Sequence, residues 1–200
     1  KIMLHHEISG NGKKPLVLLH GFMENTTIWD EMEAHLSKDF TLIKIDLPGH
    51  GKSKVYQEIH TVELMAEKVK EVIDALKLEK INLLGHSLGG YVSLAFAEKF
   101  PEILESMTLF FSTTVADDEE KKQIRRRSIA VIDENFETFV KTSIPNLFSN
   151  NEKDILEGKI ELAKNIAKST NKEGVKAAQL GMAERPDRTE ILENLDAKIL

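Results

Sequence analysis

The sequence contains no cysteine, and this absence removes several kinds of chemistry at once. Disulfides, thiolate metal sites and a cysteine nucleophile are all excluded. The sequence also lacks an excess of basic residues: it has 27 basic and 33 acidic residues, and its formal net charge is −6. A nucleic-acid partner requires a basic face, so this balance argues against one. We interpret the short basic run Arg125–Arg127 as the solvated face of a helix.

Long apolar runs are absent too, and none approaches the length that spans a bilayer. The chain opens on Lys1-Ile2-Met3 without the pattern of a signal peptide. We therefore expect a cytoplasmic protein with no membrane partner. No histidine pair has the spacing of a metal site such as His-Glu-x-x-His, so we expect neither a metal nor a cofactor. The pattern leaves the oligomeric state open.

The first half of the chain alternates short apolar runs with amphipathic segments. Strands are predicted at residues 2–8, 15–19, 40–45, 81–84 and 107–111, and helices at 25–36, 61–76 and 88–100. Thr61 is the expected N-cap of the second helix. Strand–helix alternation of this kind predicts an α/β fold, with a mostly parallel sheet and helices on both faces.

The pattern changes after Ser112, where residues 116–185 are helical in character and contain no strand-like run. A strand-like segment returns at residues 197–200. We therefore divide the chain into an α/β core at 1–112, a helical insertion at 113–184, and a return to the core at 185–200. The last residues begin a further core strand.

The strongest chemical signal is Gly85-His86-Ser87-Leu88-Gly89, which lies between a predicted strand and a predicted helix. A turn this tight strains the serine backbone and pushes the serine oxygen beyond the sheet. The positions two residues before and after the serine must hold small residues, because larger side chains would clash there, and they are Gly85 and Gly89. We interpret Ser87 as a catalytic nucleophile, facing the N-terminus of the following helix.

A second signal, His20-Gly21-Phe22, directly follows the first buried strand. A glycine turn there lets a backbone N–H point toward the same crevice as Ser87. The N–H groups of Phe22 and Leu88 are therefore the candidate oxyanion hole.

A third segment, Asp46–Ser53, ends in Gly-Lys-Ser and imitates a phosphate-binding loop. A true loop of that type needs glycine at the position of Asp46, so the nucleotide interpretation fails. A structured loop after a strand remains.

The remaining aromatic and imidazole side chains are predicted to be structural. His20 and His50 are expected to stabilise loops through hydrogen bonds, and Trp29 to pack in the core. His86 is expected to point away from Ser87 and pack under the helix. The other histidines are predicted at surface or strand positions, namely His5, His6, His35 and His60.

Taken together, the three motifs resemble the α/β-hydrolase superfamily, in particular its small esterase, enol-lactonase and lyase members. The resemblance covers residues 1–112 closely. It implies that residues 113–184 form a helical cap, and that the C-terminal part of the fold is missing from this sequence. The motifs are specific to the superfamily and are not specific to a substrate.

The resemblance also implies where the other catalytic groups lie. Chain order in this family is serine, then aspartate or glutamate, then histidine. The acid follows the strand that begins at Ala197, and the histidine comes later, so both are expected beyond Leu200. Some members place the acid after the preceding strand, near residues 112–118. Asp117 is a poor candidate there, because it fits the start of a helix better.

We therefore predict hydrolysis of an ester or lactone of a small carboxylic acid through an acyl-enzyme on Ser87. One alternative is a lyase or C–C hydrolase on the same scaffold. Another is a catalytically inert fragment or a binding protein, if the molecule ends at Leu200. A dehalogenase is disfavoured, because such enzymes need a carboxylate where Ser87 stands.

Overall fold

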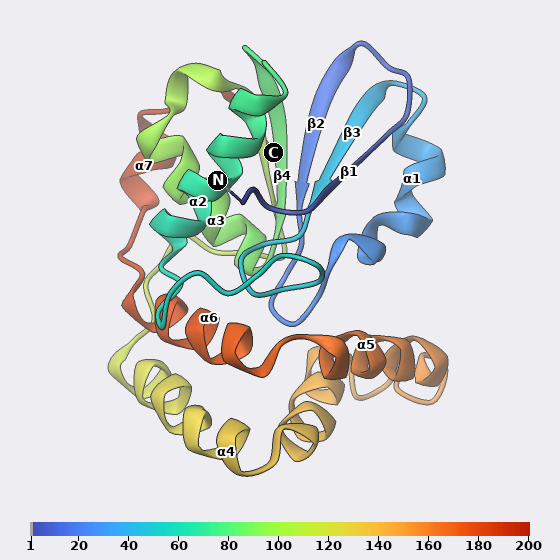
Figure 1. The fold of residues 1–200 in the computed structure, drawn as a ribbon, viewed down its shortest axis with the longest axis vertical. Coiled ribbons are helices and arrows are strands. Elements are labelled where there is room, and N and C mark those ends of the chain that lie inside the picture. The colour runs from blue at the N-terminus through green and yellow to red at the C-terminus, as the bar shows by residue number, and fades with distance from the viewer. Residues whose placement is uncertain (1) are drawn as a thin grey trace.

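The computed structural model describes residues 2–200, which form one mixed sheet, helices beside it and a helical layer at one end (Figure 1). The strand order is β1-β3-β2-β4-β5-β6, and every pairing is parallel except that of β1 with β3. The strands are β1 (His6–Ser9), β2 (Lys14–Leu19), β3 (Phe40–Ile45), β4 (Ile81–His86), β5 (Leu104–Phe110) and β6 (Lys198–Ile199). The predicted α/β class with a mostly parallel sheet is confirmed.

Alternate residues of β2 face opposite sides of the sheet, as strand geometry requires. Leu16 and Leu18 pack with Trp29 on the side covered by α1 (Asp30–Leu36). Val17 and Leu19 pack on the other side, in the cluster that includes the buried faces of α2 (Val62–Ala75) and α3 (Leu88–Lys99). Figure 1 shows α1 on one side of the sheet and α2 and α3 on the other. Helices on both faces are therefore confirmed.

Local capping explains where two predicted helices begin. The Thr61 hydroxyl accepts a hydrogen bond from the N–H of Leu64 and starts α2, as predicted. The predicted helix at 25–36 divides into a 3-10 turn, η1 (Thr26–Trp29), and α1. The reason is that Asn25 accepts from the N–H of Thr27 and starts a separate, tighter turn. Strand β4 also runs two residues beyond its predicted end, to His86.

The helical layer comprises α4 (Glu119–Ser143), α5 (Glu157–Ser169) and α6 (Lys172–Glu184), with the short η3 (Ile144–Leu147) between α4 and α5. It lies across the end of the sheet where the loop after β2 emerges (Figure 1). Helix α4 breaks at Asn135, whose backbone is extended and whose side chain accepts from the N–H of Thr138. Asn135 thus starts a second helical segment within α4.

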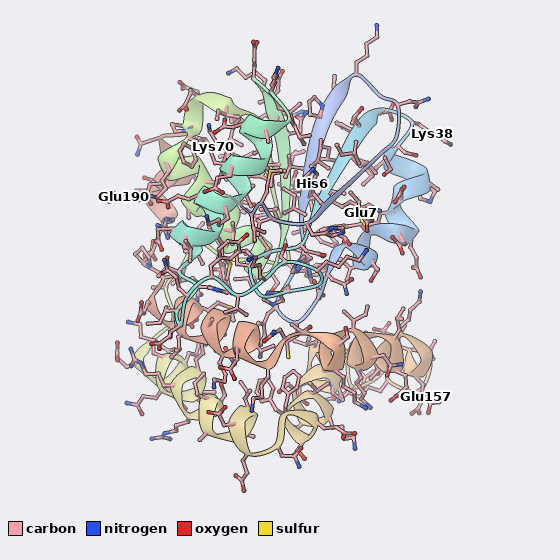
Figure 2. All side chains as sticks on the ribbon, viewed as in Figure 1. His6, Glu7, Lys38, Lys70, Glu157 and Glu190 are labelled. Atoms are coloured by element: carbon pink, nitrogen blue, oxygen red, sulfur yellow. The ribbon has the colours of Figure 1, made fainter. Side chains whose placement is uncertain are left out.

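Most charged side chains point outward, as Lys38, Glu157 and Glu190 do in Figure 2. The chain that returns from the helical layer carries an exception. Arg188 is 5% exposed and binds Glu63 of α2 at 2.5 Å and Glu98 of α3 at 2.7 Å. This arginine fixes the returning chain to the core, just before α7 (Thr189–Glu193).

Candidate active site

Ser87 occupies the turn between β4 and α3, with φ of +49° and ψ of −112°. A non-glycine residue in this region is strained and persists only when its surroundings hold it. The Ser87 N–H donates to the carbonyl of Phe110 at 3.0 Å. The Ser87 carbonyl accepts from the N–H of Gly90 at 2.8 Å and from the Ser112 hydroxyl at 2.9 Å. Strand β5 and the first turn of α3 therefore hold the strained turn in place.

Glycine is required on both sides of this turn because there is no space for a side chain. A Cβ added at Gly85 would overlap the Gly89 carbonyl and the Ser93 hydroxyl. A Cβ added at Gly89 would overlap the carbonyl of Leu19 on β2. The α3 helix can therefore approach β2 and β4 only with both glycines present.

The Ser87 hydroxyl is half-buried and makes no hydrogen bond within residues 2–200. Leu88 is the first residue of α3, so its N–H has no partner inside the helix. The N–H of Phe22 likewise has no partner in the described part of the chain. Phe22 and Leu88 follow β2 and β4, which pair in parallel with Leu19 opposite Gly85. The sheet thus brings the nucleophile candidate and both candidate donors together at the carboxyl ends of β2 and β4.

The fully buried side chain of His20 stabilises the loop after β2. Its Nδ1 lies 2.7 Å from the Gly21 carbonyl, and its Nε2 accepts from the N–H of Leu47 at 2.9 Å. These partners keep the proton on Nδ1, and burial lowers the pKa of His20. The predicted loop-stabilising role of His20 is confirmed.

The helical layer packs against the same loop. Met23, 3% exposed and at φ +58°, belongs to the apolar cluster of α4, α5 and α6, and Phe22 packs against that cluster. The helical layer thus contacts the residues that flank one candidate oxyanion donor.

The loop that begins at Asp46 is built on that residue's carboxylate. Its two oxygens accept from the N–H groups of Thr26, at 2.8 Å, and Lys52, at 2.9 Å. The Ser53 hydroxyl donates to the Asp46 carbonyl at 2.6 Å. These hydrogen bonds confirm the interpretation of a structured loop.

Two further histidines lie in this region, and one was mispredicted. His50 is buried with its Nδ1 3.0 Å from the Pro48 carbonyl, as expected of a loop-stabilising residue. His60 was predicted at the surface or in a strand, but it is fully buried. The ring Nε2 of His60 accepts from the backbone N–H of Tyr56, and the backbone N–H of His60 donates to the Ala177 carbonyl of α6. The sequence missed this burial because α6, which covers His60, lies more than a hundred residues later.

The predicted packing of His86 under the helix is wrong. Its imidazole is 25% exposed and does not pack under the helix. The carboxylate of Glu24 accepts from its Nδ1 at 2.9 Å, and its ring lies 5.8 Å from the ring of Phe110. Glu24 is 62 positions earlier in the chain, so no local pattern announced the pair.

Asp117 also differs from its predicted role. Asp118, not Asp117, caps α4, by accepting from the N–H of Lys121. Asp117 is 7% exposed and binds Arg125 at 2.5 Å and Arg185 at 3.0 Å. Burial alone would raise the pKa of Asp117, but the hydrogen bonds from both arginines outweigh it and keep the pKa low. Asp117 is thus committed to a structural ion pair, in line with its weak candidacy as a catalytic acid.

Within residues 2–200, no three histidine, aspartate or glutamate side chains gather as a metal site would require. None of the described histidines hydrogen-bonds to Ser87. Among the same residues, no helix combines the length and the apolar character needed to cross a bilayer.

The sheet order, the strained serine turn and the helical layer define an α/β-hydrolase architecture. Residues 14–156 match the family described as alpha/beta hydrolase fold, and the chain belongs to this family. A thermophilic esterase from Thermogutta terrifontis is 35% identical, with a TM-score of 0.92, and the match covers 98% of this chain and 72% of that chain. The enol-lactonase from Burkholderia xenovorans LB400 shares the fold, with 21% identity, a TM-score of 0.89, and coverage of 98% and 75%.

A relative of different activity also matches. The 2-hydroxy-6-oxononadienedioate/2-hydroxy-6-oxononatrienedioate hydrolase of Escherichia coli is 34% identical over 113 residues, which cover 54% of this chain and 39% of that protein. The chain spans about a third of the length of the first curated relatives it matches, which are uncharacterized mycobacterial proteins.

Proposed function

We propose that this chain carries the nucleophile and oxyanion hole of a serine hydrolase that cleaves a carboxylic ester or lactone. One observation carries the proposal: Ser87 is held in a strained turn with a free hydroxyl, at the edge where two N–H groups also lack partners. Backbone strain and unpaired donors both cost free energy, and active sites are where such costs accumulate. Hydrolase membership and the esterase relative support the same conclusion.

In the proposed reaction, a base removes the Ser87 proton as the serine oxygen attacks the carbonyl carbon. The oxyanion that forms accepts hydrogen bonds from the N–H groups of Phe22 and Leu88. The alcohol leaves with a proton from the base and an acyl-enzyme remains on Ser87. Water, deprotonated by the same base, then attacks the ester and releases the carboxylic acid.

The described residues do not supply the base, since His20 and His86 are engaged elsewhere. Following the family's chain order, the proposal assigns both the histidine and its acid to positions after Leu200 in the full-length polypeptide. It also assigns residues 113–184 the role of a cap over the site. The apolar cluster of the helical layer packs against Phe22, which places this layer beside one candidate oxyanion donor.

The proposal is tested by the hydrolysis of p-nitrophenyl acetate and butyrate by the full-length protein and by Ser87→Ala. We expect turnover by the wild type and a loss of kcat/KM of about 10³-fold or more in the variant. Ser149→Ala, which changes an exposed serine of the helical layer, should behave as the wild type does. Equal turnover by wild type and Ser87→Ala would refute the proposal.

The similarity to the Escherichia coli hydrolase supports a second candidate, cleavage of a C–C bond beside a ketone on the same scaffold. The two candidate functions are distinguished by which of two substrates the enzyme prefers. A C–C hydrolase should turn over a vinylogous 1,5-diketone at least tenfold better than an aryl ester, in kcat/KM. An ester hydrolase should show the reverse order.

A further inference from the structure

The Glu24 carboxylate joins two segments that are far apart in the sequence. Its Oε2 accepts from the Nδ1 of His86 at 2.9 Å and from the N–H of Gly21 at 2.5 Å. The Glu24 N–H donates back to the Gly21 carbonyl at 3.2 Å, which closes a tight turn. The Glu24 and His86 side chains are 26% and 25% exposed, so the bridge is partly accessible to solvent.

The position of this bridge relates directly to the two candidate oxyanion donors. Glu24 lies two residues after Phe22, and His86 lies two residues before Leu88. The Phe22 donor belongs to the loop after β2, whereas the Leu88 donor belongs to the turn after β4. The distance between the two N–H groups therefore depends on how these segments are held together, and the Glu24–His86 bridge holds them at that point.

The packing around Gly21 shows that the bridge and the loop fit closely. A Cβ added at Gly21 would lie 2.6 Å from Glu24 Oε2 and 2.9 Å from His86 Nδ1. These distances are shorter than any van der Waals contact, so the glycine is required for the bridge to form. The bridge also occupies Nδ1 of His86, which leaves the proton there and fixes the orientation of the ring.

We infer that Glu24 and His86 are positioning residues that set the separation and direction of the two oxyanion donors. The inference rests on the proposed function and extends it, because it assigns a role to two side chains that do not touch the reacting atoms. Removal of a single oxyanion donor costs about 10²- to 10³-fold in kcat in a known serine hydrolase. A displaced donor should cost less, about ten- to a hundredfold in kcat. KM should change little, because the substrate ground state gains little from these donors.

The test is a double-mutant cycle of Glu24→Ala, His86→Ala and the double variant in the full-length enzyme, with thermal unfolding to verify folding. Each single variant should lose about ten- to a hundredfold in kcat, with KM within about twofold of wild type. The double variant should lose no more kcat than the more impaired single variant loses, because both substitutions break the same bridge. Glu24→Gln keeps an acceptor for Gly21 and His86 and should recover most of the loss. Glu58→Ala, at an exposed loop position, is the matched control and should not change kcat.

The other outcomes overturn the inference in distinct ways. Unchanged kcat in both single variants, or losses that multiply in the double variant, would show that the bridge does not position the donors. A loss in His86→Ala as complete as in Ser87→Ala would identify His86 as the base instead. A wild-type enzyme without ester turnover or serine reactivity would refute the proposed function itself, and the inference with it.

Discussion

His50 makes the stability of this fold depend on pH. Its side chain is fully buried, and burial, followed by the proximity of His20, lowers its pKa to about 3. A histidine in the unfolded chain has a pKa of about 6.5. Between these two values the unfolded state binds a proton that the folded state does not. The contribution to stability is therefore complete above about pH 6.5 and is lost progressively as the pH falls toward about 3.

The size of the effect follows from linkage. One histidine of this kind lowers the free energy of unfolding by about 2 kcal/mol between pH 7 and pH 5. For a domain of this length, that corresponds to a fall in Tm of about 4–8 °C. Burial also lowers the pKa of His20 and His60, so the wild type should lose at least this much.

The contribution of His50 is isolated by urea unfolding of the wild type and of His50→Gln at pH 7, 6 and 5, followed by circular dichroism. Glutamine retains a donor for the Pro48 carbonyl but does not titrate. The variant should lose about 2 kcal/mol less than the wild type between pH 7 and pH 5. His35→Gln, at an exposed position of α1, should parallel the wild type. Parallel curves for the wild type and His50→Gln would refute the reasoning.

Two further predictions concern the helical layer, and both are measured by urea unfolding at pH 7. Asp117→Asn leaves the buried Arg185 and the partly buried Arg125 without their carboxylate and should cost about 3 kcal/mol. Asp118→Asn keeps a good N-cap and should change stability by less than about 0.5 kcal/mol; equal effects would contradict the buried ion pair. Gly181→Ala places a methyl group against a loop carbonyl and should cost about 1–3 kcal/mol. Gly158→Ala in α5 meets open space and should stabilise by about 0.5–1 kcal/mol, so a gain at both positions would contradict the close packing of α6.

Features encoded by neighbouring residues were predictable from the sequence. The strand Phe40–Ile45 has its predicted bounds, and the α2 helix begins at the predicted Thr61 cap, because apolar periodicity and side-chain capping act within a few residues. The turn at Ser87 was predictable for the same reason, since two glycines at fixed spacing are needed to form it.

Features that depend on distant segments were missed. The burial of His60 depends on α6, and the bridge of His86 depends on a glutamate 62 positions away. Asp117 was assigned to the start of a helix, but Arg185, with which it forms a buried ion pair, lies 68 positions later. No local periodicity reports such contacts, since they form only when the sheet and the helical layer are assembled.

The most direct test of the central claim is the intact mass of the full-length protein before and after exposure to a fluorophosphonate, with Ser87→Ala alongside. An activated serine in this turn predicts one adduct per wild-type molecule and none in Ser87→Ala, while Ser149→Ala is labelled as the wild type is. A wild-type protein without an adduct, or an adduct that persists in Ser87→Ala, would contradict the assignment of Ser87 as the nucleophile.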